Sequence, residues 1–224
     1  MQSFIKYLGL LFVLIFTTQG AFSQEKTQIK NEAKKYNHQM KSALYTLYKA
    51  GNVETFNMSS KQLRKIADEQ NTKWVPYYHA TYAYIMTAFL SKEKFKAEEL
   101  LNQAQICIDK AKKLSPNNHE IVALQGFLYQ ARIGVNPQAR ASEYSRKAMK
   151  EYDHARFMNP DNPRPYYLIG QLLYRLPIEL GGNKENACKH FQEAADRFET
   201  FKPRSEFSPN WGQAANAILL KKCK

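Results

Sequence analysis

The sequence predicts an all-α protein built from antiparallel helical hairpins that stack side by side. Glycine is scarce outside turns, proline gathers at the apparent ends of helices, and no stretch alternates apolar and polar residues as a strand would. A helical pattern also recurs at a fixed interval, which is typical of repeat proteins. We expect helices near residues 25–50, 54–70, 75–90, 95–114, 119–133, 139–158, 164–176, 184–199 and 208–222.

The first 23 residues have the composition of a secretory signal peptide. Met1–Lys6 is a short basic start, Tyr7–Phe16 is an apolar core, and Ala21-Phe22-Ser23 is a small-x-small cleavage site. The apolar core is about half of the roughly 20 residues that a membrane span needs, which disfavours an anchor. We therefore expect export, cleavage after Ser23, and no integral membrane segment in the mature chain.

Chain length and net charge limit the number of domains and the kinds of partner that we expect. Residues 24–224 are enough for one domain with a sizeable core, and a single domain is the expectation. The formal net charge is +13, with lysines spread along the chain. Such an excess indicates solvated helix faces, attraction to acidic partners or attraction to an anionic membrane, and charge alone does not separate these. Export and the absence of any nucleic-acid motif disfavour a nucleic-acid partner.

A repeat with a spacing of 44 residues underlies the hairpin prediction. Its unit is a small, a large and a small residue on one helix face, followed by a proline that ends the helix and, later, by a glycine in the next helix. The matched positions are Ala104 and Ala148, Ile108 and Tyr152, Ala111 and Ala155, Pro116 and Pro160, and Gly126 and Gly170, with a partial copy at Ala187, Phe191 and Ala194. Small residues on this face allow a partner helix to approach closely.

This pattern resembles the tetratricopeptide repeat family, whose unit is about 34 residues long. The resemblance covers about residues 54–199 and implies an α-solenoid, with the flanking helices, including the last one at about 208–222, acting as caps. The sequence departs from the family within the hairpins, since Gly126 and Ala148 are farther apart than the family's spacing. We expect the extra residues to form loops at one edge of the stack, at Ser91–Lys96, Gly134–Arg140 and Pro177–Asn183.

A looser similarity links the chain to small envelope repeat proteins of Gram-negative bacteria, including those that accompany solute transporters. It implies a protein of the periplasm or the cell exterior. The function that we expect is a non-catalytic scaffold for a protein or peptide partner, of unknown identity. The alternative is a binding protein for a small organic anion, accessory to envelope transport.

The family resemblance also implies a ligand groove on the inner surface of the first helix of each hairpin. The positions carried over are His79, Met86, Glu120, Phe127, Gln130, Arg164, Tyr167, Gln171, Tyr174 and Arg175. This mixture of aromatic, amide and basic groups suits a peptide or a small acidic ligand, and Arg164 and Arg175 could bind a carboxylate. The alternative is a solvated concave face without a ligand.

Nothing in the sequence predicts catalysis, a cofactor or a metal site. No pair of histidines has the HExxH spacing, and no nucleophile-elbow, phosphate-loop or dinucleotide motif occurs. We therefore expect ordinary surface or packing roles for the histidines, which are His38, His79, His119, His154 and His190.

The cysteines and one tryptophan give two further expectations. Cys188 lies near the start of one helix and Cys223 just after the end of the next, so antiparallel packing would bring them together as a disulfide; the alternative is two unpaired thiols. Cys107 falls among packing residues. Trp211 is expected to begin the last helix and to cover the last hairpin.

Overall fold

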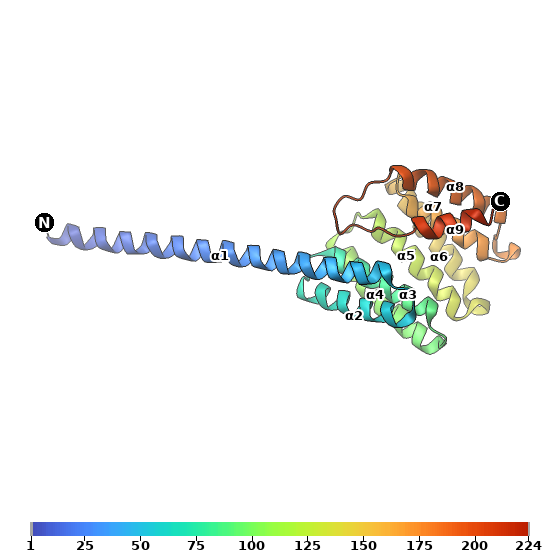
Figure 1. Cartoon of the computed structure of the whole chain (residues 1–224), viewed down its shortest axis with the longest axis horizontal. Helices are drawn as coiled ribbons and strands as arrows, with labels where there is room; N and C mark the ends of the chain where they lie inside the picture. The colour runs from blue at the N-terminus through green and yellow to red at the C-terminus, as the bar shows by residue number, and fades with distance from the viewer. Residues whose placement is uncertain (1, 224) are drawn as a thin grey trace. The chain divides into compact units, whose positions relative to one another are not determined.

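The structure, a computed structural model, describes the backbone of residues 2–223 and the side chains from Gln24 to Cys223. This part of the chain is helical and contains no strand, which confirms the all-α prediction. The elements in Figure 1 are α1 (Gln2–Lys49), α2 (Val53–Glu69), α3 (Trp74–Leu90), α4 (Lys94–Leu114), α5 (His119–Val135), α6 (Pro137–Met158), α7 (Pro163–Arg175), the 3-10 turn η1 (Ile178–Leu180), α8 (Lys184–Thr200) and α9 (Gln213–Lys221).

The chain divides into two compact units, Met1–Lys41 and Ser42–Lys224. The predicted signal peptide falls on residues whose side chains lie outside the described part, and the single domain over 24–224 stays a prediction. Among the residues with described side chains, no helix is both long and apolar enough to cross a membrane. The following paragraphs concern the second unit.

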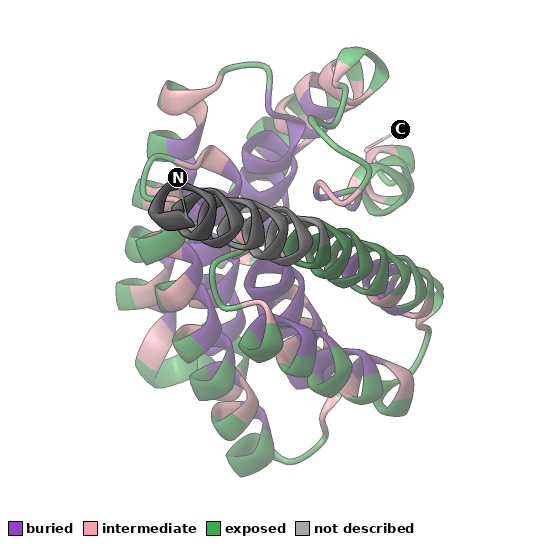
Figure 2. Cartoon of the chain, turned by 90° about the vertical axis from the view of Figure 1, so that its left-hand side faces the viewer, coloured by how far each residue is buried: buried purple, intermediate pink, exposed green. Residues whose placement is uncertain are grey.

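Three antiparallel hairpins, α3 with α4, α5 with α6, and α7 with α8, form the body of this unit. Within two of them a glycine of the first helix faces an aromatic ring of the second. A Cβ atom at Gly126 would lie 2.4 Å from Tyr152 Cε1, and one at Gly170 would lie 2.7 Å from Phe191 Cδ1. Tyr152 and Phe191 are fully buried, and Figure 2 shows the buried residues along the helix faces that meet. The repeated glycines therefore lie where the two helices of a hairpin pack closely against each other.

The extra length of the repeat lies mainly in the helices, so the predicted projecting loops are wrong in two of three places. Only residues 91–93 separate α3 from α4, and only Asn136 separates α5 from α6. The Asn136 side chain accepts a hydrogen bond from the Ala139 N–H, and Pro137 occupies the first turn of α6, so this helix begins at once. The third hairpin does have a longer connection, residues 176–183, which includes η1.

The last helix begins at Gln213 rather than near residue 208. Gly212 precedes it with a φ of 105°, a left-handed conformation that interrupts any helix from the upstream side. Residues 201–212 form an irregular connection between α8 and α9, which we call the strap (Figure 1). The predicted disulfide between Cys188 and Cys223 is present and joins α8 to the end of the chain.

We predict that Gly126→Ala destabilises the protein by about 1–3 kcal/mol, because the new methyl group overlaps a buried tyrosine ring that cannot move aside. Gly134→Ala is the matched control on the same helix, since a Cβ atom there meets nothing within 4 Å. The control should be neutral or slightly stabilising. Urea unfolding of the two variants measures the difference, and equal stability would show that the close approach is not required.

We also predict that replacing both cysteines, in Cys188→Ser with Cys223→Ser, lowers the free energy of unfolding by about 3 kcal/mol. The bond closes a segment whose ends are 35 positions apart, and its removal restores freedom to the unfolded chain. Thermal unfolding with and without reductant measures this loss. An unchanged midpoint after verified reduction would contradict the prediction.

Candidate ligand-binding cleft

The strap is fixed to the inner surface of the hairpins by hydrogen bonds with α3 and α7, the first helices of two of them. Each bond joins groups that are far apart in the sequence. The three bonds run from His79 Nε2 to the Phe207 carbonyl (2.9 Å), from Arg164 Nη2 to the Pro209 carbonyl (2.5 Å), and from Trp211 Nε1 to the Tyr78 hydroxyl (3.0 Å). Burial lowers the pKa of His79 to about 4, so its imidazole is neutral at neutral pH, and its one N–H is on Nε2 because the Phe207 carbonyl can only accept.

Trp211 closes the inner surface that the strap crosses. Its indole stacks on Tyr82, with ring centroids 4.8 Å apart and planes at 22°, and on Phe127, with centroids 5.7 Å apart and the same angle. Trp211 therefore covers the first two hairpins rather than the last one alone, and it precedes α9 instead of starting it. The groove that the sequence predicted is filled by the chain's own C-terminal segment at this point.

A buried ion pair joins equivalent positions of two successive repeats. Glu120 and Arg164 are 44 residues apart, and each lies in the first turn of its helix. Their backbone N–H groups donate to the side chains of Asn118 and Asn162, respectively. Arg164 Nη1 donates to Glu120 Oε1 at 2.9 Å, and the two residues are 2% and 5% exposed. Burial raises the pKa of the Glu120 carboxyl, while the Arg164 guanidinium acts in the opposite direction. Arg164 also lies over the rings of Phe201 and Trp211.

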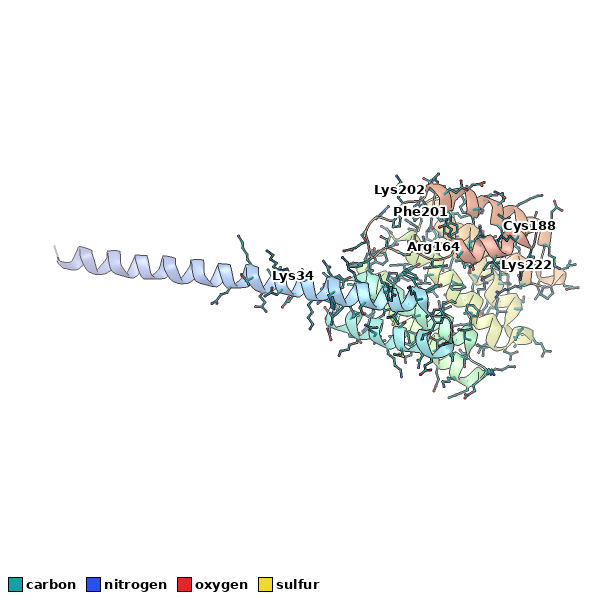
Figure 3. All side chains as sticks on the ribbon, in the orientation of Figure 1. Lys34, Arg164, Cys188, Phe201, Lys202 and Lys222 are labelled. Carbon is teal, nitrogen blue, oxygen red and sulfur yellow. A yellow bond between two sulfur atoms is a disulfide. The ribbon has the colours of Figure 1, made fainter. Side chains whose placement is uncertain are left out.

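A cleft of about 700 Å³ opens beside this ion pair. It lies between the N-terminal ends of α3 and α5, the turn before α7, and the strap. The aromatic and titratable residues of the lining are Trp74, His119, Glu120, Asp161, Phe201, Lys202 and Arg204. The volume falls within the range of about 300–1,000 Å³ that is usual for small-molecule sites. Figure 3 labels Phe201 and Lys202 of the strap together with Arg164.

The cleft combines flat aromatic walls with positive charge. Trp74 and Phe201 supply the rings. Lys202 and Arg204 make no ion pair with any described residue, whereas Glu120 is already paired with Arg164. Asp161 is the other carboxylate in the lining, so the unpaired charges leave a net positive balance. This arrangement suits a flat aromatic molecule that carries carboxylates.

His119 supplies an imidazole to the cleft. Its Nδ1 lies 2.8 Å from the Asn162 amide nitrogen, and its Nε2 lies 3.1 Å from the Asn159 amide nitrogen. Burial lowers the pKa of His119 to about 4, and the charges of Arg204 and Arg164 act in the same direction. The ring is therefore neutral at neutral pH. No cluster of three potential metal ligands occurs among the described side chains, so a metal in the cleft would depend on His119 and the ligand itself.

The ten predicted groove residues are placed in three environments. Arg175 is exposed, and Met86 and Tyr174 are half-buried. The buried ones are His79, Glu120, Phe127, Gln130, Arg164, Tyr167 and Gln171. Gln130, Gln171 and Tyr167 form part of a hydrogen-bonded chain that begins at the Tyr152 hydroxyl. Of the ten, the structure brings Glu120 to the cleft and Arg164 to a second cavity. Their role in binding stays a prediction.

Sequence reasoning missed most of the cleft lining, including Trp74, His119 and the strap residues Phe201, Lys202 and Arg204. The strap has the composition of a loop, with two prolines and no helical periodicity. The sequence feature that could have indicated this part of the cleft is the occurrence of two cations, Lys202 and Arg204, next to Phe201 in a segment without a helical pattern.

The chain is similar to a solved structure, the HusA haemophore from Porphyromonas gingivalis. The TM-score is 0.76 and the sequence identity is 27%, over 84% of this chain and 92% of that one. The chain shares the helical fold of that protein. No protein-family profile matches it, and no curated protein does. A haemophore is by its name a haem carrier, so the similarity is compatible with a binding role rather than a catalytic one.

Proposed function

We propose that this protein is an exported, non-catalytic carrier that binds a flat aromatic acid of the porphyrin type, such as haem, in the cleft beneath the strap. The observation that carries the proposal is the cleft itself, in which two aromatic walls and two unpaired cations occur together. The haemophore fold supports it independently.

The chemistry of a porphyrin complements this lining. A porphyrin presents two broad apolar faces, which can lie against the rings of Trp74 and Phe201. Haem also carries two carboxylates on one edge, and the cations of Lys202 and Arg204 are separated by a single residue. Charge-assisted hydrogen bonds from these two groups would fix the orientation of the ligand.

The inner surface of the hairpins favours a carrier of a small ligand over a scaffold for a peptide. A peptide groove requires an open channel, whereas Trp211 and the strap occupy this surface between α3 and α5. A small ligand needs only the cleft. The small organic anion that the sequence left as an alternative is therefore the ligand that we propose. The hairpins would be a tetratricopeptide-like repeat with lengthened helices, in a protein of the Gram-negative periplasm or cell exterior.

We predict that the protein binds haemin with a saturable change in the Soret band, and that Lys202→Ala with Arg204→Ala weakens binding about tenfold. Each exposed cation contributes on the order of 0.7 kcal/mol to the pairing with a carboxylate. The matched control is Lys92→Ala with Lys94→Ala, which removes the same charge beyond the far end of α3, about 25 Å away along the helix.

Three results of this titration are informative. Weaker binding in the strap variant alone supports the cleft. Equal weakening in both pairs would mean that only net charge matters, and the absence of saturable binding by the unaltered protein would overturn the proposed function.

We further predict that iron-free protoporphyrin IX binds within about threefold of haemin. Both ring nitrogens of His119 already face asparagine amides, so recognition should depend on the ring and its carboxylates rather than on the iron. Fluorescence titration with the iron-free ligand and absorbance titration with haemin measure the two affinities. If haemin bound far more tightly and His119→Ala removed the difference, His119 would be an iron ligand.

A further inference from the structure

The two ring nitrogens of His119, at the start of α5 in the wall of the cleft, face different surroundings. Nδ1 lies 2.8 Å from the amide nitrogen of Asn162, a residue with no exposed surface. Nε2 lies 3.1 Å from the amide nitrogen of Asn159, which lines the cleft as His119 does. The Nδ1 edge of the ring is therefore turned to the interior, and the Nε2 edge lies between two lining residues.

The orientation of the Asn162 amide decides which nitrogen of His119 carries the proton. Its Oδ1 accepts the backbone N–H of Arg164 at 3.1 Å, so its NH₂ group is the part that faces His119 and donates to Nδ1. A ring nitrogen that accepts a hydrogen bond carries no proton, and a neutral imidazole carries a single N–H. Burial keeps the ring neutral, with a pKa of about 4, so the N–H is on Nε2.

The Nε2–H of His119 meets a second donor rather than an acceptor. Asn159 Oδ1 accepts the backbone N–H of Asp161 at 3.1 Å, in the turn after α6, so the amide nitrogen of Asn159 is the atom that faces His119. Two donors thus face each other in the wall of the cleft. A ligand oxygen placed beside them removes this mismatch, because it can accept from both groups.

The charge of Arg204 selects the kind of oxygen. Arg204 lines the same cleft from the strap and makes no ion pair with any described residue. Its positive charge acts on both His119 and Glu120, which places the guanidinium near the start of α5. An uncompensated guanidinium near two N–H donors favours a carboxylate, whose two oxygens can accept from different groups at once.

We infer that His119 and Arg204 form a carboxylate subsite of the cleft, in which the His119 Nε2–H and the Arg204 guanidinium donate to one acid group of the ligand. The inference rests on the proposed function and deepens it, because it places one carboxylate and selects acids over esters. It also makes His119 a hydrogen-bond donor and not an iron ligand. Metal binding at Nε2 would require the proton to move to Nδ1, where the Asn162 amide already donates.

The tautomer of His119 can be measured without a ligand. In protein labelled with ¹⁵N at histidine, a ring nitrogen with a proton and one without resonate in well-separated regions, and His119→Ala assigns the signals. We expect a protonated Nε2 and an unprotonated Nδ1. The opposite tautomer would overturn the inference, whatever the protein binds.

Benzoate and methyl benzoate are matched probes of the subsite, since they share a ring and differ in the carboxylate. We expect benzoate to shift the Nε2 resonance of His119 and the indole N–H resonance of Trp74, which lines the same cleft, in a saturable manner. Methyl benzoate should bind about tenfold more weakly. Equal binding of the two probes, a benzoate shift of Trp74 without one of His119, or no benzoate binding at all would overturn the subsite.

Two variants test the two donors separately, with the Trp74 resonance as the measure of benzoate binding. His119→Ala should weaken binding about tenfold and Arg204→Ala about threefold. Arg175→Ala is the matched control, because it removes an exposed arginine at the opposite end of α7 from the cleft and should leave binding unchanged. Arg204 is exposed on the strap, so this variant decides the outcome even if His119→Ala does not fold. Equal weakening in Arg204→Ala and Arg175→Ala would overturn the subsite.

Protoporphyrin IX separates this inference from the proposed function. Saturable benzoate binding at His119 without any porphyrin binding would leave the carboxylate subsite in place and remove the proposed function. Porphyrin binding that leaves both ring nitrogens of His119 unshifted would support the proposed function and overturn the subsite.

Discussion

The buried pair of Arg164 and Glu120 is the interaction on which the arrangement of the inner surface depends. Two charges with almost no exposure are tolerated only when each has a partner, and removal of one would leave the other uncompensated, at a cost of about 3–5 kcal/mol. Because the pair joins α5 to α7, it fixes the spacing of successive repeats. Arg164 also holds the Pro209 carbonyl, so the same side chain places the strap.

Two orphaned atoms show that this pair is satisfied only in part. Arg164 Nε and Glu120 Oε2 are buried without hydrogen-bond partners. A pair whose sole role was stability would be expected to have all its polar groups satisfied. The two unsatisfied atoms therefore reduce the net stability that this pair contributes.

The sequence predicts those features of the structure that depend on residues close together in the chain or repeated at a regular interval. The glycines Gly126 and Gly170 recur 44 residues apart, and the rings that they face, Tyr152 and Phe191, recur 39 residues apart, so the hairpins could be found from the numbering. The starts of helices could also be predicted, because an asparagine side chain accepts a hydrogen bond from a backbone N–H of the first turn and proline is favoured in that turn. The loop prediction failed because a spacing between repeats does not reveal whether the extra residues continue a helix or leave it.

The cleft escaped prediction because the strap has no periodicity and its position is set by distant contacts. The bond from His79 to Phe207 joins positions 128 residues apart, and no spacing rule predicts it. Residues such as Glu120 and Phe127 were assigned to an open groove because the resemblance places that surface toward a ligand. They are buried because the chain returns to cover them.

The way in which the strap is held has a consequence for ligand entry. Its residues from Lys202 to Glu206 are exposed. Its attachments are individual hydrogen bonds, two through strap carbonyl groups and two to tyrosine hydroxyls, and one stacked indole, whereas the hairpins are held by continuous buried faces. Local opening with few buried apolar contacts requires much less free energy than global unfolding. We therefore expect opening of the strap to require less free energy than unfolding of the repeats. The disulfide keeps the end of α9 joined to α8 during such an opening, so the strap can return to the same place over a bound ligand.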